Sequence, residues 1–316
     1  MIKELNIALI GCGNWGKNIA RNLYEMGSLA CVYDTNIKLS EKISYDYSLP
    51  TLELQKIFKD QNINAVVIAS PAITHKDMAT EALNNNKDVF VEKPFCLSLI
   101  DAQKLSELAT NKNRILMVGH LLNYHNAFIK MKELIKNGKI GDLQNIRANR
   151  LALGAIRSEE SVIYDLSAHD VSMILSIMKE LPIDINVQSI HHHNNFGPDA
   201  VCVKLSFENG VTALINSDWM CPYKEHKFSV IGTKGSLIFD DTKIWSEKLL
   251  YNPSIVTSKN SIINAPIEKI KLQENEPLKT ELKEFINCIC SGKSPVTDHK
   301  EAVKVQTVID MIDKKI

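Results

Sequence analysis

Three glycines near the start of the chain, Gly11, Gly13 and Gly16, lie between a short apolar run and a helical segment. Glycine at these positions allows a tight turn, a close approach of the backbone to a diphosphate, and close packing of helix on strand. The first turn of the following helix also offers unpaired backbone N–H groups to phosphates. The loop, which includes Asn14 and Trp15, therefore predicts a dinucleotide site.

A carboxylate follows at the distance that such a site requires. Asp34 ends the next predicted strand, 18 positions after Gly16. A carboxylate there accepts hydrogen bonds from the ribose hydroxyls of the adenosine and repels a 2′-phosphate. The sequence therefore favours NAD over NADP, and the alternative is a glycine turn in some other doubly wound fold.

A lysine lies just beyond another predicted strand, in the sequence Glu92-Lys93-Pro94. Ligands of open parallel sheets bind at the carboxyl ends of the strands, which is where Lys93 is expected. When a hydride leaves an alcohol carbon, the hydroxyl proton needs an acceptor, and a lysine with a lowered pKa can hold or relay that proton. Lys93 is therefore a catalytic candidate, with a solvated loop lysine as the alternative.

A second acid–base candidate comes from Asp165 and His169, four residues apart at the start of a helical run. Residues with this spacing share one face of a helix, so both side chains can point into one cleft. Histidine is the usual acid or base near neutral pH, and a nearby carboxylate can orient it. The alternative is a histidine that is only packed or hydrogen-bonded in a core.

The first 120 positions alternate strand-like runs, rich in branched residues, with helical segments. This alternation predicts a parallel sheet wrapped by helices, an α/β Rossmann domain over residues 1–119. The strand-like runs are Leu5–Ile10, Leu29–Tyr33, Ala65–Ser70, Asp88–Val91 and Ile115–Val118, and the helical segments include Lys17–Met26, His75–Asn84 and Leu97–Ala109. After this region, Ala127–Asn137 is expected to form one more helix.

The remainder, residues 120–316, is expected to form an α+β domain with an open-faced, mainly antiparallel sheet. The runs 201–207 and 211–217 alternate apolar and polar residues, and the Asn209-Gly210 pair between them favours a tight hairpin. One helix, beginning near Pro277, is expected after the sheet. The polar stretch 252–276 is expected to run over the surface.

Composition limits the classes of partner. With 37 Lys and Arg against 37 Asp and Glu, the net charge is zero, which offers no long-range attraction for nucleic acid or an anionic membrane. No signal peptide or membrane-spanning run is indicated. Seven cysteines without a Cys-x-x-Cys pair favour reduced thiols in the cytoplasm over disulfides or zinc. His191, His192 and His193 would alternate in direction on a strand, so no metal site is expected.

The glycine loop, Glu92-Lys93-Pro94 and Asp165-x-x-x-His169, in this order and spacing, resemble the Gfo/Idh/MocA oxidoreductases along essentially the whole chain. The resemblance implies a Rossmann domain joined to an open-faced sheet domain. It places Lys93 and His169 at the reacting hydroxyl with Asp165 in support, and it implies a Lys93–Pro94 peptide that is often cis. It also assigns Glu92, and a second loop with Ser70, Pro71 and His75, to the cofactor.

The same resemblance assigns further residues to the substrate. The stretches 119–125 and 160–164 differ from many relatives. The stretches 119–125, 149–151 and 167–170 look most similar to enzymes acting on nucleotide-activated amino sugars. A related UDP-sugar acid, a free polyol such as inositol, and a non-catalytic NAD-binding regulator remain alternatives. The residues expected at the substrate are His120, Asn123, Tyr124, Arg150 and Tyr164.

An open sheet has to cover its apolar face with helices or with another subunit. The sequence therefore predicts a homo-oligomer, either a dimer or a tetramer.

Overall fold

The computed structural model describes residues 5–154, 156, 160–193, 197–257 and 261–316. The chain forms two compact units. The first unit comprises Met1–Leu121 and Glu276–Gln306, and the second comprises Leu122–Asn275 and Thr307–Ile316. The boundary predicted between residues 119 and 120 lies two residues before the point, after Leu121, at which the chain passes from the first unit to the second. The return of the C-terminal segment to the first unit is a feature that the simple two-part division did not include.

The first unit is built on a five-stranded parallel sheet in the order β2-β1-β3-β4-β5. The chain adds β2 on one side of β1 and then adds β3, β4 and β5 on the other, so a topological switch point lies between β1 and β3. Sheets of this kind bind ligands at such a point, at the carboxyl ends of the strands. All four residues of β1, β3 and β4 are buried, as expected for strands covered on both faces. The strands are β1 (Ile7–Ile10), β2 (Leu29–Tyr33), β3 (Ala65–Ile68), β4 (Asp88–Val91) and β5 (Leu116–Val118).

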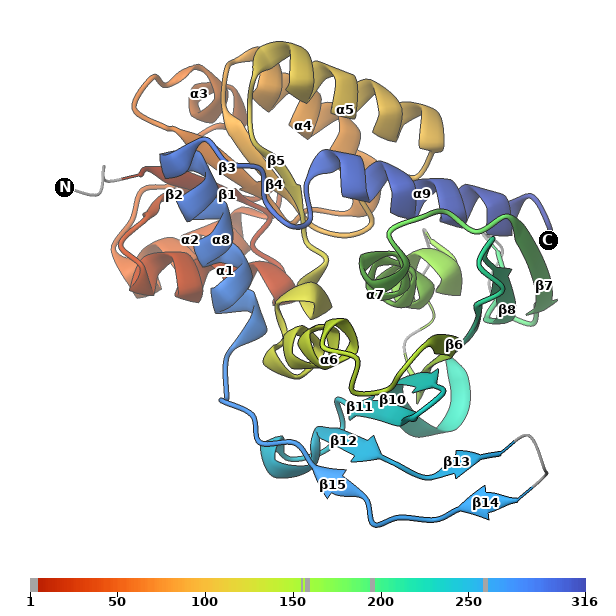
Figure 1. Ribbon diagram of the computed structural model, residues 1–316. Helices are drawn as coiled ribbons and strands as arrows, with labels where there is room; N and C mark the ends of the chain where they lie inside the picture. The colour runs from red at the N-terminus through yellow and green to blue at the C-terminus, as the bar shows by residue number, and fades with distance from the viewer. Residues whose placement is uncertain (1–4, 155, 157–159, 194–196, 258–260) are drawn as a thin grey trace. The chain divides into compact units, whose positions relative to one another are not determined.

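Helices cover both faces of this sheet (Figure 1). The predicted helices 17–26, 75–84 and 97–109 and the helix near Pro277 form with end shifts of a few residues, because apolar side chains recur at helical spacing and pack on the strands. The helices are α1 (Asn14–Glu25), α2 (Ile37–Tyr47), α3 (Leu54–Lys59), α4 (His75–Asn84), α5 (Leu99–Lys112) and α8 (Pro277–Ser291), together with the first half of α9 (His299–Asp313).

The C-terminal segment contains two helices, α8 and α9, so the expectation of a single helix was wrong. Between them, the Thr297 carbonyl accepts a hydrogen bond from the Val118 N–H at 2.9 Å, and the Thr297 hydroxyl donates to the Val118 carbonyl at 2.8 Å. These bonds attach the segment to the edge of β5. A contact at such long sequence separation leaves no local signal in the sequence.

The second unit contains an eight-stranded sheet in the order β15-β12-β11-β10-β6-β9-β8-β7. All neighbours pair antiparallel except β6 and β9, which are parallel. The predicted Asn209-Gly210 hairpin joins β8 to β9, with Gly210 at φ +80°. The strands are β6 (Leu143–Leu153), β7 (Asp184–Ile190), β8 (Ala200–Ser206), β9 (Thr212–Asp218), β10 (Met220–Gly232), β11 (Gly235–Asp240), β12 (Leu249–Asn252) and β15 (Glu268–Lys269).

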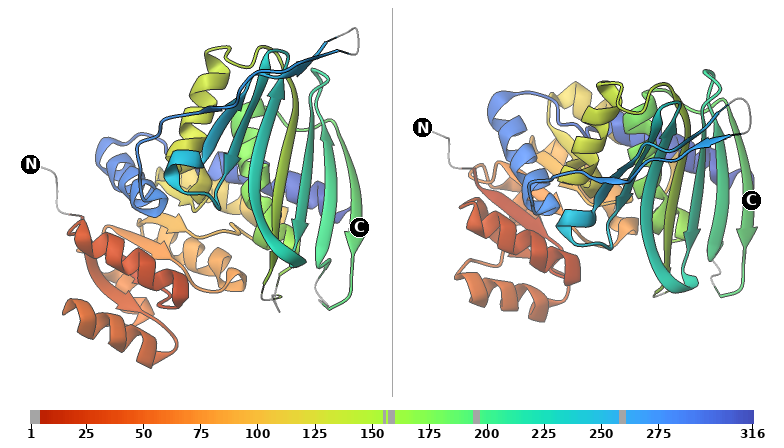
Figure 2. Two further views of the ribbon diagram at one scale, coloured as in Figure 1. Left: turned by 90° about the horizontal axis from the view of Figure 1, so that it is seen from below. Right: turned by 60° about the horizontal axis from the view of Figure 1, so that its bottom comes forward.

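One face of this sheet packs against α6 (Asn126–Lys136) and α7 (Ala168–Met178), whereas no described helix lies on the other (Figure 2). The open face is more polar than the sequence suggested. Asn149 donates to Glu225 at 2.8 Å and accepts from Asn216 at 2.8 Å, which forms a polar row across β10, β6 and β9. The stretch 252–276, expected to run over the surface, contains β15 and the small hairpin β13 (Ile255–Val256) and β14 (Ile262–Ile263).

The triple histidine follows the end of β7 and does not lie on the strand as expected. The backbone N–H groups of His192 and His193 both donate to the carboxylate of Asp199. Among the described residues no cluster of three or more His, Cys, Asp or Glu has a metal-binding arrangement. All seven cysteines are free thiols. No described helix combines the length and the apolar character that crossing a membrane requires.

Candidate functional site

The glycine loop of the first unit has the geometry of a nucleotide cradle. Gly11 has φ +101°, and a Cβ there would lie 2.5 Å from the carbonyl carbon of Ala69 in the neighbouring loop. A Cβ on Gly16 would overlap the carbonyl oxygen of Gly11. A Cβ on Gly13, by contrast, would meet nothing within 4 Å. Two of the glycines therefore permit packing, while the third leaves open space for an approaching group.

Helix α1 begins at this open space. Its N-cap residue is Gly13, which has no side chain to bind the first N–H groups of the helix, and the first turn contains no acidic residue. The N–H groups at this helix end therefore remain available to an anion, where the helix dipole also favours negative charge. This arrangement fits the diphosphate of a dinucleotide.

Asp34 connects the cradle to the end of β2. Its Oδ2 accepts a hydrogen bond from the Cys12 N–H at 2.6 Å, and its Oδ1 accepts from the Asn36 N–H at 2.7 Å. A carboxylate has about four lone-pair positions, so both oxygens keep capacity for ribose hydroxyls. Asp34 thus supports the loop as well as presenting a negative charge at the adenosine end of the site.

A cavity of about 450 Å³ adjoins these groups. It lies at the carboxyl ends of β1, β2 and β3, the edge at which sheets of this order bind ligands. The Ser70 hydroxyl on its rim lies 2.7 Å from the Thr74 hydroxyl and donates to the sulfur of Met78. Its lining includes Gly11, Gly13, Asp34, Ser70 and Pro71.

Trp15 and Glu92 extend the cradle toward the end of β4. The indole Nε1–H of Trp15 donates to Glu92 Oε1, and the Lys93 backbone N–H donates to Glu92 Oε2 at 3.3 Å. Gly119 gives this carboxylate room, since a Cβ there would lie 2.8 Å from Oε2. Burial raises the pKa of Glu92 to about 7, although Trp15 and the charge of Lys93 oppose the rise.

Lys93 lies directly after β4, and its peptide bond to Pro94 is cis, as the resemblance implied. His75 contacts the backbone on both sides of its ring: its Nδ1 lies 2.8 Å from the Pro94 carbonyl and its Nε2 lies 2.9 Å from the Ser70 carbonyl. The ring is only 1% exposed. His75 therefore links the two loops, and its assignment to the cofactor site stays a prediction.

His120 follows β5 and is also buried in the first unit. Its Nδ1 lies 2.7 Å from Oε2 of Glu301, on α9. Glu301 comes from the C-terminal segment, 181 positions away, so no local pattern in the sequence indicates this pair. A role for His120 at the substrate stays a prediction, and Glu301 fixes the orientation of its ring.

In the second unit, Asp165 and His169 lie on either side of a change in helix type. Residues Ile163–Ser167 form a π-turn, and α7 starts at Ala168, so the continuous α-helix expected from the sequence is wrong for its first turn. The Trp219 Nε1–H donates to Asp165 Oδ2 at 3.0 Å in the interior. π-Turns are rare and are frequent at functional sites. The buried Trp219 thus holds the carboxylate in place.

The other substrate candidates have partners within the second unit. Arg150 on β6 donates from Nε and Nη2 to the two carboxylate oxygens of Asp170, at 3.2 and 2.9 Å. The Tyr164 hydroxyl donates to Asp313 at 2.8 Å. Tyr124 is 4% exposed. Their contacts with substrate stay predictions.

Asn123 differs from this group because one of its polar atoms is unused. Its Nδ2 donates to the Ser172 hydroxyl at 2.8 Å, whereas its buried Oδ1 has no hydrogen-bond partner among the described residues. A buried acceptor without a donor costs free energy. Asn123 is therefore able to accept a hydrogen bond from a ligand.

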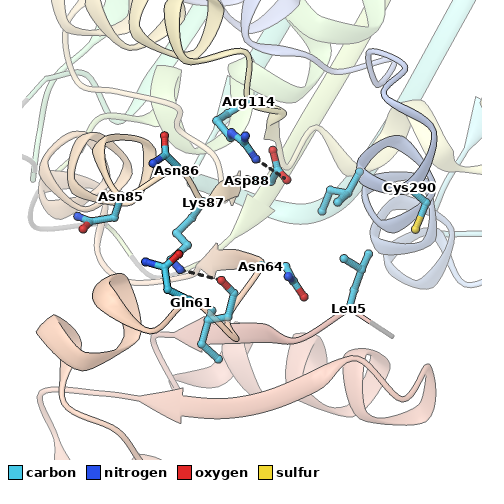
Figure 3. A pocket seen from close by; sticks show the side chains of 11 residues that line it. Leu5, Gln61, Asn64, Asn85, Asn86, Lys87, Asp88, Arg114 and Cys290 are labelled. Atoms are coloured by element: carbon cyan, nitrogen blue, oxygen red, sulfur yellow. Dashed lines mark hydrogen bonds and ion pairs between the residues drawn. The ribbon is translucent and has the colours of Figure 1, made fainter. Parts of the chain in front are cut away.

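A second cavity, of about 530 Å³, lies in the first unit at the amino ends of β3 and β4 (Figure 3). Lys87 donates to the carbonyls of Asp60 and Ile63, and Arg114 lies 3.9 Å from Asp88. Lys87 therefore provides hydrogen bonds to loop carbonyls, and Arg114 forms an ion pair with Asp88. This larger cavity lies at the edge opposite to the glycine loop, so the smaller cavity is the candidate cofactor site.

The fold and the cradle together define an oxidoreductase with an NAD-binding Rossmann domain. Residues 5–120 match the family described as "Oxidoreductase family, NAD-binding Rossmann fold", and residues 128–238 match the "GFO/IDH/MocA C-terminal domain". The chain belongs to the Gfo/Idh/MocA oxidoreductase family, and its cofactor is NAD.

Relatives of known activity align over nearly the whole chain. The scyllo-inositol 2-dehydrogenase (NAD(+)) of Bacillus subtilis is 25% identical, covering 98% of this chain and 93% of that protein. The UDP-N-acetylglucosamine 3-dehydrogenase of Acidithiobacillus ferrooxidans is 22% identical, covering 93% and 92%. A solved structure of the latter enzyme superposes with a TM-score of 0.86 at 20% identity, covering 99% and 98%. At that identity the superposition establishes the shared fold.

Replacement of Asp34 tests the adenosine end of the cradle. We expect Asp34→Ala to raise the Kd for NAD⁺ at least tenfold, about 1.4 kcal/mol, because two loop hydrogen bonds and the ribose acceptor are lost. Discrimination against NADP⁺ should shrink at the same time. Isothermal titration calorimetry measures both, with the exposed Asp46→Ala as control. An unchanged Kd for NAD⁺ would remove Asp34 from the site.

Replacement of His75 tests the link between the loops. We expect His75→Phe to destabilise the protein by about 1–3 kcal/mol at pH 8, because the neutral ring donates its one N–H to one of the two buried carbonyls, and that carbonyl loses its donor. Burial lowers the pKa of His75 from its usual 6.5. The contribution of His75 is therefore fully present above pH 6.5 and shrinks as the pH falls below that value, because the unfolded chain then binds the extra proton. Urea denaturation at several pH values measures this, and a constant difference would contradict it.

Proposed function

We propose that this protein oxidises a ring hydroxyl of a sugar to a ketone, with NAD⁺ as the hydride acceptor. The observation that carries the proposal is the cradle: Gly13 leaves open space beside the uncapped start of α1, and Asp34 stands at the ribose end. Glu92 and Lys93 follow β4 at the same edge of the sheet. Membership of an NAD-dependent oxidoreductase family supports the same reaction class.

The chemistry divides between the cofactor and the side chains. Bound NAD⁺ accepts the hydride from the carbon that carries the hydroxyl. The hydroxyl proton passes to Lys93 or His169, which we propose as the catalytic groups, and Asp165 supports His169. Trp219 keeps Asp165 oriented through its indole N–H. A fixed carboxylate of this kind restrains the orientation of a histidine and stabilises its protonated form.

For the substrate, we propose UDP-N-acetylglucosamine, oxidised at C3 to the 3-keto sugar that amino-sugar biosynthesis for lipid A or surface polysaccharide would use. Support comes from the segment 119–125, from Asn149-Arg150-Leu151 and from the run 167–170, which resemble enzymes of this substrate class. The alignment with the 3-dehydrogenase over 93% of the chain agrees with this choice. Asn123, with its unused buried oxygen, is the candidate hydrogen-bond acceptor for the sugar.

A free polyol is the second candidate, because the inositol dehydrogenase of Bacillus subtilis has the higher identity of the two relatives. A related UDP-sugar acid is a third candidate, and the same experiment tests it. The purified protein is supplied with NAD⁺ and each of UDP-N-acetylglucosamine, a UDP-sugar acid, scyllo-inositol and myo-inositol. NADH formation is followed and the product is identified by mass spectrometry. A 3-keto UDP-sugar supports the first proposal, and an inosose supports the second.

Variants of the two catalytic candidates separate an enzyme from an NAD-binding regulator. We expect Lys93→Ala and His169→Ala each to lower kcat by about 10²–10⁴, because proton transfer from the hydroxyl loses its acceptor. The Kd for NAD⁺ should change less than threefold with His169→Ala, since His169 lies in the second unit. Each variant keeps one of the two candidate groups, so the pH dependence of its kcat identifies the group that titrates. Absence of turnover in every form on the whole panel would favour the regulator.

We also propose that the protein is a cytoplasmic homo-oligomer, a dimer or a tetramer, that associates through the open face of the eight-stranded sheet. The row formed by Asn149, Asn216 and Glu225 offers hydrogen-bonding groups to a second copy. Light scattering coupled to size exclusion measures the assembly. Association should weaken in Asn149→Lys, and a monomer of the unmodified protein at all concentrations would contradict the proposal.

A further inference from the structure

Helix α8 packs on β4 through two phenylalanines of the first unit. Phe285 and Phe90 are both fully buried, with ring centroids 5.8 Å apart and planes at 63°. Glu281 lies one turn before Phe285 on α8, and Glu92 lies two residues after Phe90 along the strand direction. Residues four apart on a helix share a face, and residues two apart on a strand share a side. Glu281 and Glu92 therefore extend from the same contact surface as the two rings.

The distance from Glu281 to Phe285 along α8 also matches the distance from Phe90 to Glu92 along the strand. Four residues of helix rise about 6 Å, and two residues of strand rise about 6.6 Å. The Glu92 N–H donates to the Ile68 carbonyl at 2.9 Å, so the extended conformation continues past the end of β4. Ile289 and Cys290, at the C-terminal end of α8, line the cavity at the amino ends of β3 and β4, so α8 runs opposite to β4. With Phe285 against Phe90, this direction brings Glu281 toward Glu92.

The other charged groups at the start of α8 are paired with α1. Glu276 binds Arg21 and the Asn22 side chain, and Lys279 Nζ lies 2.7 Å from Glu25. Glu281 differs from all of them: it is 0% exposed, and neither carboxyl oxygen has a hydrogen-bond partner among the described residues. An ionised carboxylate without a counter-charge is very costly in such a place, so a buried group of this kind keeps its proton.

The other charged groups near these two carboxyls lie beside Glu92. Lys93 adjoins Glu92 in the chain, and His120, at the end of β5, faces it while being held by Glu301 of α9. Both Lys93 and His120 lower the pKa of Glu92. The charged group that acts on Glu281 is Glu92.

We propose that the buried Glu281 is a neutral carboxylic acid in the working protein and forms, with Glu92, a two-carboxyl pair in which Glu92 alone ionises. Glu281 is then a positioning residue: it fills the space behind Glu92 without adding a second negative charge. Glu92, bound to Trp15 of the glycine loop and to the backbone of Lys93, is left as the single ionisable carboxyl on this side of the cradle.

The titration directions agree with this assignment. Burial and the neighbouring Glu92 raise the pKa of Glu281 well above 4.5. Burial raises the pKa of Glu92 to about 7. The first proton leaves the pair near neutral pH, and the second leaves only at higher pH. The consequence for catalysis, a charge beside Lys93 that changes near pH 7, rests on the proposed function, whereas the protonation of Glu281 does not.

The first experiment measures unfolding of the wild type and of Glu281→Gln by urea at several pH values from about 5.5 to 8. Above pH 4.5 an unfolded Glu281 loses its proton while the folded one keeps it, so the wild type becomes less stable as the pH rises. The wild-type unfolding equilibrium constant should therefore increase about tenfold per pH unit relative to Glu281→Gln. Glu284→Gln, on the same helix but partly exposed, should show no such trend. A constant ratio for Glu281→Gln would overturn the proposal.

The second experiment follows Trp15 fluorescence against pH, because its indole N–H reports on Glu92. The wild type and Glu281→Gln should share a midpoint near pH 7 within about half a unit, and Glu92→Gln should lose it. A midpoint more than one unit lower in Glu281→Gln would mean that residue 281 carries a charge, and would overturn the proposal. Neither measurement uses a sugar, so their outcome is independent of whether the dehydrogenase is found.

A third measurement covers the case in which Glu281→Gln does not fold. In Glu92→Gln at about pH 8, infrared spectroscopy should still detect a protonated carboxyl group, assigned to Glu281. Its absence would overturn the proposal. Where a substrate is found, the kcat profile of the wild type should follow the Trp15 midpoint, and Glu281→Gln should preserve that profile, whereas a charged residue 281 would shift it.

Discussion

The close approach of Gly11 to Ala69 is the constraint on which the cofactor site depends. The backbone of the glycine loop passes so near to the end of β3 that no side chain fits at Gly11, and α1 starts so near to the loop that none fits at Gly16. These contacts bring the start of α1 to the carboxyl edge of the sheet. The N–H groups of the helix, which have no capping side chain, then point toward the cavity between the loops.

Several polar bonds connect the neighbouring loops beside this close approach. Asp34 binds the glycine loop to β2, His75 connects the Ser70 and Pro94 carbonyls, and Glu92 binds Trp15. Each bond connects segments that follow the carboxyl ends of different strands. Because buried polar groups are costly when unpaired, each bond also penalises a displaced loop. The edge of the sheet is thus rigid where a dinucleotide would lie.

The second unit holds its candidate groups by a different means. A π-turn precedes α7 and carries Asp165, whose carboxylate is fixed by Trp219, and Arg150 is held by both oxygens of Asp170. The interior face of the sheet is therefore polar around α7, where an apolar core would be the simpler choice. Such fully bonded polar groups give fixed orientations, at the cost of taking charges and dipoles out of water.

The sequence by itself determined the local features. The glycine spacing, Asp34, the alternation of strands and helices, and the Asn209-Gly210 hairpin follow from backbone sterics and side-chain periodicity, which act over a few residues. Only the tertiary structure decided which distant groups meet. Glu301 beside His120, Trp219 on Asp165, and Glu281 near Glu92 are pairs separated by more than 50 positions. No local pattern encodes such pairs, because their positions follow from the packing of whole helices on the two sheets.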